Sequence, residues 1–126
     1  MKIKNIKFKA KQLNSGKWFE GDLVRLGNRV CIGGDHIKDG ITDVDPSTVC
    51  MFTGLKDCEG NETWEGDILQ DVDNDDIKYV VIFDVGAFLA RKEGLYTSIP
   101  LHECVGSLGN DVITYAKVVG NKFDKK

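Results

Sequence analysis

Apolar and charged residues alternate near the beginning of the chain. The apolar positions are Ile6, Phe8 and Ala10, and the positions that follow each of them are Lys7, Lys9 and Lys11. Successive side chains of a β-strand point to opposite faces, so this period of two puts the apolar side chains on one face and the lysines on the other. The pattern predicts a half-buried strand with a basic outer face.

A β-hairpin is predicted after this strand. Residues 14–17 have the composition of a turn, and residues 18–26 form a second strand candidate. Gly27 and Asn28 tolerate the positive φ angles of a tight turn, so we expect the chain to return as a strand over residues 29–32. Further along, Asp45 before Pro46 predicts one short capped helical or 3₁₀ turn.

Runs of β-forming residues continue in the second half of the chain. We expect strands over residues 64–69, 79–83, 87–91 and 112–119. The run 79–83 consists of β-formers only, which predicts a central strand buried on both faces. Residues 95–99 are a weaker strand candidate, and residues 100–104 have the composition of a short helical turn.

The fold class follows from the spacing of these signals. No segment offers twelve residues of helix-period apolarity, whereas turn signals recur about every 8–12 residues, which is typical of small barrels and sandwiches. A chain of 126 residues has the size of one domain or of two small subdomains sharing a core. The sequence therefore predicts a mainly β fold with little helix, beginning with an N-terminal β-meander.

One phrase is written twice, 45 positions apart: Glu20-Gly21-Asp22 and Glu65-Gly66-Asp67 each lie between an aromatic and aliphatic residues. Such a step lets a chain turn, bond its own amides through the Asp carboxylate, and enter a strand. We therefore expect a structural role for a set of turn residues, which comprises Trp18, Glu20, Gly21, Asp22, Gly54, Asp57, Gly60, Trp64, Glu65, Gly66 and Asp67.

The acidic residues and histidines of the chain could also serve metal binding or catalysis. The carboxylates of Glu20, Asp22, Asp57, Glu65 and Asp67 would suit a hard divalent cation if the two phrases met in space. The chain offers only two histidines, both isolated in expected loops, so no nucleophile has a base and an orienting group in the sequence. Residues 71–76 resemble a calcium loop, but Asp76 stands where glycine is needed. The sequence predicts no catalytic residue, no metal and no cofactor.

Composition limits location and redox state. The chain is 41% hydrophobic and 29% charged, with 14 glycines against 2 prolines, which favours tight turns over disorder. No stretch approaches the ~20 apolar residues of a membrane span, and the first residues lack a signal peptide's apolar segment, so we expect a cytoplasmic protein. The four cysteines form no Cys-x-x-Cys pair, which favours reduced thiols, with Cys31 buried and Cys58 exposed in a polar turn.

Charge is distributed unevenly along the chain. Residues 1–30 hold eight Lys and Arg against two acids, whereas residues 31–126 hold nine against eighteen. Asymmetry of this kind indicates a nucleic-acid arm, an acidic partner, or complementarity within or between copies of the chain. Complementarity is favoured here because the pI of 5.3 is far from that of a typical nucleic-acid binder.

The strongest candidate binding surface is a basic face. It is expected to combine Lys7, Lys9 and Lys11 with Lys17, Arg25 and Arg29 from the neighbouring hairpin. Small β-barrels bind nucleic acid with such cations next to aromatic side chains on which bases stack, and Trp18 or Phe19 would supply the aromatic. The simpler interpretation, a solvated strand face, is favoured, and exposed strand edges make self-association another use of this region.

Four ordered blocks resemble one protein family. They are residues 6–10, residues 16–24, residues 44–69 with the pattern Thr53-Gly54-Leu55-Lys56-Asp57-x-x-Gly60-x-x-x-Trp64-Glu65-Gly66-Asp67, and residues 118–124. Together they are similar to the YopX family of phage and prophage proteins and span nearly the whole chain. The resemblance implies an N-terminal β-rich section over 1–49, an SH3-type small barrel over 50–126, and encoding by a phage or prophage. It supplies no catalytic residues.

Three functional hypotheses follow from these observations. The first is a non-catalytic phage accessory protein that binds another protein in the bacterial cytoplasm, with a homo-oligomer as one form of this. The second is a nucleic-acid-binding protein that uses the basic N-terminal face. The third and most distant is a metal-dependent enzyme that uses the carboxylates of the two Glu-Gly-Asp phrases.

Overall fold

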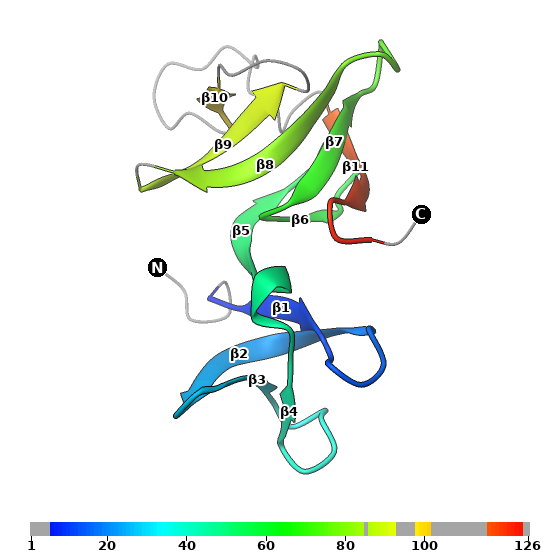
Figure 1. Cartoon of the computed structure of the whole chain (residues 1–126). Helices are drawn as coiled ribbons and strands as arrows, with labels where there is room; N and C mark the ends of the chain where they lie inside the picture. Colours follow the sequence, from blue (N-terminus) through cyan, green and yellow to red (C-terminus); the bar gives the residue numbers. More distant parts are fainter. Residues whose placement is uncertain (1–5, 85, 93–97, 102–115, 125–126) are drawn as a thin grey trace. The chain divides into compact units, whose positions relative to one another are not determined.

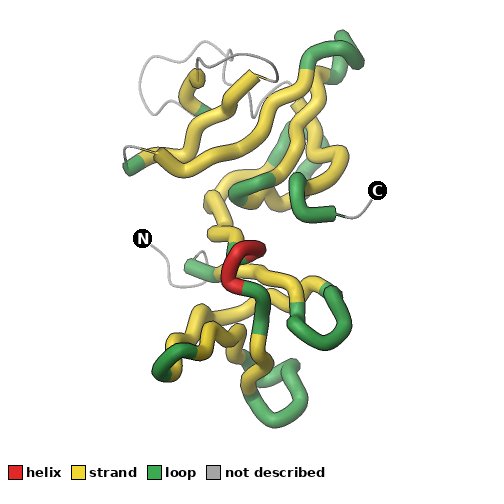
Figure 2. The backbone as a smooth tube through the Cα atoms, viewed as in Figure 1, coloured by secondary structure: helices red, strands yellow, loops and turns green. Residues whose placement is uncertain are grey.

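The computed structural model describes residues 6–84, 86–92, 98–101 and 116–124. The chain divides into two compact units, Met1–Phe52 (unit 1) and Thr53–Lys126 (unit 2). Within the described residues, strands and loops account for nearly all of both units (Figure 2). The mainly β fold predicted from the sequence is confirmed.

Unit 1 is built on antiparallel strands. In chain order its elements are β1 (Phe8–Lys11), β2 (Trp18–Leu26), β3 (Arg29–Gly33), β4 (Ile41–Asp43), the 3₁₀ turn η2 (Pro46–Thr48) and the first residues of β5 (Cys50–Lys56). They are hydrogen-bonded in the order β4-β3-β2-β1-β5. An isolated antiparallel bridge between Gln12 and Val44 also joins the segment after β1 to the segment after β4.

The core of unit 1 confirms the predicted alternation for Phe8 and Ala10 but not for Ile6, which precedes β1 and is 44% exposed. Ala10 is fully buried and Phe8 packs against the same cluster, which contains Ile32 and Val44. Gly27 has φ of 60° and forms the predicted hairpin turn between β2 and β3, whose register pairs Leu26 with Arg29. The predicted cap is also present, because the Asp45 side chain accepts a hydrogen bond from the Ser47 amide at the start of η2.

Unit 2 contains the end of β5 and six further strands. They are β6 (Glu62–Trp64), β7 (Asp67–Asp71), β8 (Lys78–Asp84), β9 (Ala87–Lys92), β10 (Ser98–Pro100) and β11 (Ala116–Asn121). The end of β5 is hydrogen-bonded to β6, and the other five strands form a sheet in the order β10-β9-β8-β7-β11 (Figure 1). Neighbouring strands of this five-stranded sheet are antiparallel.

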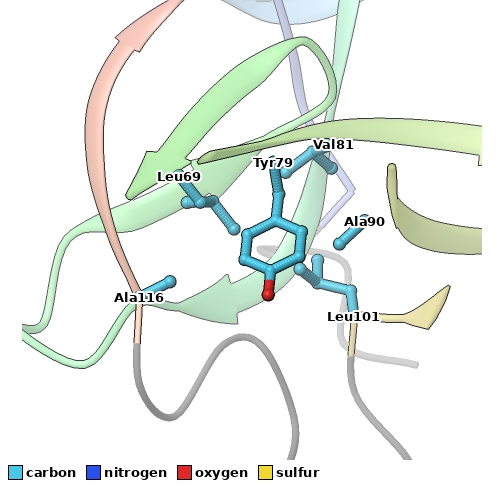
Figure 3. Packing of buried hydrophobic residues seen from close by; sticks show 6 residues of the cluster. All are labelled: Leu69, Tyr79, Val81, Ala90, Leu101 and Ala116. Atoms are coloured by element: carbon cyan, nitrogen blue, oxygen red, sulfur yellow. The ribbon is translucent and has the colours of Figure 1, made fainter. Parts of the chain in front are cut away.

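One face of the five-stranded sheet carries the core of unit 2. The cluster contains Leu69, Tyr79, Val81, Ala90, Leu101 and Ala116. Figure 3 shows the Tyr79 ring lying among Leu69, Ala90 and Leu101. The buried cluster thus draws on strands from both ends of the unit, which joins β11 to the β7–β9 meander by packing as well as by pairing.

Several expectations for unit 2 need correction. Residues 64–69 are not one strand, because a turn at Glu65 and Gly66 separates β6 from β7. β8 is the middle strand of its sheet, but it is not buried on both faces: Tyr79 and Val81 are buried, whereas the alternate positions are half-buried and Phe83 is 47% exposed. The described strands form two antiparallel sheets and no closed barrel, so the SH3-type barrel is not confirmed.

Other expectations meet the limits of the described residues. β10 and β11 overlap the strands expected over 95–99 and 112–119, but residues 95–97 and 112–115 lie outside the described part. The helical turn expected over 100–104 also falls mostly outside it. Where the structure describes the chain, no helix is long and apolar enough to cross a membrane.

Candidate functional site

The alternating lysines of β1 share a face with an aromatic side chain. Trp18 pairs with Lys11 across β1 and β2, and the Nζ atoms of Lys9 and Lys11 lie 4.7 and 5.4 Å from the centre of its ring. On the same face, Lys7 Nζ lies 4.7 Å from the Phe52 ring centre and 3.9 Å from Glu20 Oε1. The face therefore mixes cations and aromatics and also carries a carboxylate.

The other predicted members of the basic face lie elsewhere. Arg25 is on the opposite side of β2, since it alternates in step with Phe19 and Leu23, which pack on the core of unit 1. Lys17 is exposed and immediately precedes β2. Arg29 is on β3 and is paired with Asp43. The structure thus brings together the lysines of β1 and Trp18, and it places Phe19 in the core.

A pocket of about 360 Å³ lies elsewhere in unit 1. It is lined by aliphatic and prolyl side chains together with a polar rim, namely Leu13, Val30, Val44, Pro46, Asn28, Arg29 and Asp43. Leu13 is 61% exposed, the most exposed of the large hydrophobic side chains of the described residues. The volume of the pocket is at the lower end of the range found for ligand pockets.

An ion pair is fixed at the rim of this pocket. Arg29 donates to Asp43 through Nε at 2.9 Å and through Nη2 at 3.3 Å, and the Cys31 thiol donates to Asp43 Oδ1 at 3.2 Å. The hydrogen bond from Arg29, and then that from Cys31, holds the pKa of Asp43 below its ordinary value. The pKa of the Cys31 thiol is raised, first by burial and then by Asp43. Asp43 therefore stays ionised and orients the guanidinium.

The sequence did not single out most of this pocket. Its residues come from four segments between positions 13 and 46, and no periodicity or short motif links them. The only usable signal is a leucine next to the turn residues 14–17, because an apolar side chain beside a polar turn lacks an obvious place in a core. The sequence predicts Arg29 as part of the basic face and gives no signal for its pairing with Asp43.

The second Glu-Gly-Asp phrase forms a turn whose aspartate is buried. Gly66 has φ of 86°, which favours glycine, and Asp67 is 2% exposed. Asp67 Oδ2 accepts a hydrogen bond from the Trp64 amide at 2.7 Å, and Oδ1 accepts one from Asn121 Nδ2 at 3.0 Å. The carboxylate thus caps the turn between β6 and β7 and ties it to the end of β11.

The first phrase does not turn. Glu20, Gly21 and Asp22 lie inside the continuous strand β2, and the Glu20 and Asp22 side chains are exposed. A Cβ atom at Gly21 would collide with the backbone carbonyl of Gly33 on β3. A glycine is therefore required because two strands approach closely here, and the turn expected at this position is wrong.

Asp57 organises the remaining turn residues. It is 6% exposed and accepts hydrogen bonds from the backbone amides of Glu59, Asn61 and Val118 and from Asn61 Nδ2. Burial alone would raise the pKa of Asp57, but the bonds from Val118 and Asn61 outweigh it and the pKa lies below its ordinary value. Gly60 has the left-handed φ of 87° expected for this turn, and Gly54 within β5 has φ of 82°.

The described residues contain no group of three or more His, Cys, Asp or Glu side chains arranged to hold a metal ion. Both oxygens of Asp67 and both oxygens of Asp57 accept hydrogen bonds in turns. Of the thiols within the described ranges, those of Cys31 and Cys50 are buried and that of Cys58 is exposed, in agreement with the burial expected for Cys31 and the exposure expected for Cys58. Cys104 lies outside those ranges.

Comparison with known proteins identifies a family for this chain. The sequence profile of a family described as YopX protein matches residues 7–125 of the chain. No curated protein matches it. The match covers nearly the whole chain and agrees with the resemblance in the four blocks.

Proposed function

Since the chain belongs to the YopX protein family, we propose that it is a phage- or prophage-encoded accessory protein. It acts without catalysis in the bacterial cytoplasm by binding another protein. The resemblance in the four sequence blocks supports the phage origin. The pocket of unit 1 supports binding, because it joins an aliphatic surface to an oriented ion pair.

The pocket is the observation that carries this proposal. Protein interfaces centre on a few apolar anchors surrounded by polar groups, and Leu13, Val30 and Val44 beside Arg29 provide that composition in a concave site. Leu13 is largely exposed, so a partner that covered it would remove apolar surface from water.

Charge supports association with an oppositely charged surface. Unit 1 carries nine Lys and Arg against six Asp and Glu, a net charge of +3, whereas unit 2 carries eight against fourteen, a net charge of −6. Complementary charges speed encounter and select partners more than they add affinity. A homo-oligomer would use the same complementarity between copies.

Affinity capture tests the proposal. The tagged chain is used as bait in lysate of bacteria in which a related prophage has been induced, with nuclease added, and the retained proteins are identified by mass spectrometry. We expect a protein that is retained in near-stoichiometric amount and that binds the purified chain in calorimetry. If every retained protein is lost on nuclease treatment, or none binds after purification, the proposal is wrong.

Nucleic acid is the second candidate function, and one observation favours it. The cations of Lys9 and Lys11 lie over the Trp18 ring, and cations beside an aromatic side chain are the elements of single-strand binding. The Glu20 carboxylate weakens the case for nucleic acid, because it lies on the same face, 3.9 Å from Lys7 Nζ, and repels phosphate.

Fluorescence anisotropy with a labelled single-stranded oligonucleotide separates this candidate from protein binding. Binding through the face would weaken with salt and would fall in Lys9→Glu and Lys11→Glu. Lys38→Glu makes the same charge change in an exposed loop of unit 1 and is the matched control. Equal losses in all three variants would indicate general electrostatics and would remove this face as a site.

A further inference from the structure

We propose that the pocket of unit 1 binds an acidic–aliphatic peptide segment of the partner protein. An aliphatic side chain of that segment enters the pocket between Leu13, Val30 and Val44, and an adjacent Asp or Glu carboxylate binds Arg29. This inference rests on the proposed function and names the partner chemistry that the same site selects.

The apolar part of the site fits side chains of modest size. Its volume of about 360 Å³ accommodates one or two aliphatic side chains of a peptide. Pro46 adds a rigid wall, because it occupies the first position of η2 and its neighbour Asp45 is held by the bonds from Ser47. A preformed wall reduces the ordering that binding requires.

The backbone around the pocket indicates recognition through side chains. The Leu13 amide donates to the Asp43 carbonyl, the Val44 amide donates to the Val30 carbonyl, and the Asp45 amide donates to the Lys11 carbonyl. Strand addition requires edge amides and carbonyls that a new strand can pair with. Because these groups already pair with one another, the peptide is selected by what its side chains offer.

Arg29 determines the preferred charge of the peptide. A guanidinium has five N–H donors, and the bonds to Asp43 use Nε and Nη2. Asp43 accepts from Arg29 through both oxygens and from Cys31 through one of them, so the pair has more donors than acceptors left. The net charge of +3 on unit 1 also favours a carboxylate over an ammonium group.

Three capped peptides of equal length probe the site. The first alternates leucine with aspartate, the second replaces every aspartate by lysine, and the third replaces every leucine by serine. Each is titrated into the full ¹⁵N-labelled chain. We expect the first peptide to shift the amides of residues 28–30 and 43–44 and to bind roughly ten-fold more tightly than either of the others.

Two variants test the assignment of residues. Arg29→Gln and Leu13→Ser are each expected to weaken binding of the first peptide roughly ten-fold. Lys38→Gln, in an exposed loop of unit 1, and Ile6→Ser, at an exposed aliphatic residue before β1, change side chains that do not line the pocket. They are the matched controls and should bind like the wild type. Leu13 is largely exposed, so Leu13→Ser keeps the test valid if Arg29→Gln fails to fold.

The outcomes distinguish this inference from the proposed function. Equal binding of the lysine peptide, absence of binding, or shifts confined to other residues would overturn the inference. So would unchanged binding by Leu13→Ser. If the captured protein partner binds wild type, Leu13→Ser and Arg29→Gln equally, the protein is a binding module that uses another surface. If no protein partner is found although the first peptide binds as described, the proposed function is wrong but the pocket is still a peptide-binding site.

Discussion

Replacing Asp57 by Asn is expected to destabilise unit 2 by about 3 kcal/mol. The variant keeps one carbonyl oxygen for the Glu59 and Asn61 amides. In the wild type, Asp57 Oδ2 accepts from the Val118 amide at 2.8 Å and from Asn61 Nδ2 at 3.2 Å. In the variant, the new NH₂ group faces these two donors and cannot accept from them. Two donors thus lose a charged acceptor in a site that is 6% exposed.

The magnitude follows from the loss of these two bonds. A hydrogen bond to a charged group contributes roughly 1.5–3 kcal/mol, and the contributions of neighbouring bonds are not additive. A total near 3 kcal/mol is a large part of the 5–15 kcal/mol that stabilises a typical domain, and for a unit of this size it corresponds to a fall in Tm of roughly 12–24 °C. The Cys58 amide, which donates to the Ala116 carbonyl, retains part of the contact between this turn and β11.

The loss also depends on pH. The folded state holds the pKa of Asp57 below its ordinary value, so the ionised carboxylate contributes stability above the unfolded pKa of about 4. This contribution is lost as pH falls through the lower, folded pKa. The wild type should therefore lose stability below about pH 4 more steeply than Asp57→Asn.

Urea unfolding followed by tryptophan fluorescence measures the effect. In a Trp18→Phe background, the buried Trp64 of β6 reports on unit 2. Asp76→Asn, in the exposed loop between β7 and β8, is the control and should stay within about 0.5 kcal/mol of its parent. The reasoning is wrong if Asp57→Asn also stays within that range, or if its stability falls in acid as steeply as that of its parent.

Three further substitutions or reactions test the turns and strands. Asp67→Asn should destabilise unit 2 by about 2–3 kcal/mol in urea unfolding, because a side-chain amide cannot accept both hydrogen bonds that the carboxylate accepts. Asp22→Asn, on the exposed side of β2, is the control and should cost less than about 0.5 kcal/mol. Equal losses in the two variants would contradict the structural role of Asp67. Gly21→Ala should destabilise unit 1 by roughly 2–3 kcal/mol, because β3 must move to make room for the methyl group. Gly27→Ala is the comparison: its methyl group would lie in open space, so only the φ of 60° is unfavourable and the cost should be about 1–2 kcal/mol. The reverse order would refute the close approach of Gly21 to Gly33. A thiol reagent followed by mass spectrometry should modify Cys58 before the two buried cysteines of unit 1. The rate should rise with pH, but at higher pH than for an ordinary thiol, because desolvation and the nearby Asp57 and Glu59 carboxylates raise the pKa of Cys58. Initial modification at a buried thiol would contradict the fold.

The local parts of the fold were predictable from the sequence. The strand β2 and the hairpin turn at Gly27 follow from adjacent residues, and so does the cap at Asp45. β4 and β5 were not predicted, because their pairing depends on distant segments: β5 pairs with β1, where Met51 lies opposite Phe8. A strand that is specified mainly by its partner carries little signal of its own.

The candidate site shows the same limit. The alternation of lysines in β1 was enough to place them on one face, but the choice between Trp18 and Phe19 as the exposed aromatic required the register of β1 with β2. The pocket required more, since Leu13 and Asp43 meet only because the segments after β1 and β4 are bridged. Sequence patterns therefore predict faces of single elements better than they predict sites made from several.

The repeated Glu-Gly-Asp phrase shows what decides between two structures for the same residues. Gly21 continues a strand because the chain around it pairs with β1 and with β3, and the carbonyl of Gly33 lies too close to it for a Cβ atom. Gly66 forms a turn because the side chain of Asn121 lies beside it and donates to Asp67. In each case a residue distant in sequence selects the conformation, and glycine permits both. The two aspartates consequently differ in burial and bonding, so the phrase by itself predicts neither a turn nor a metal ligand.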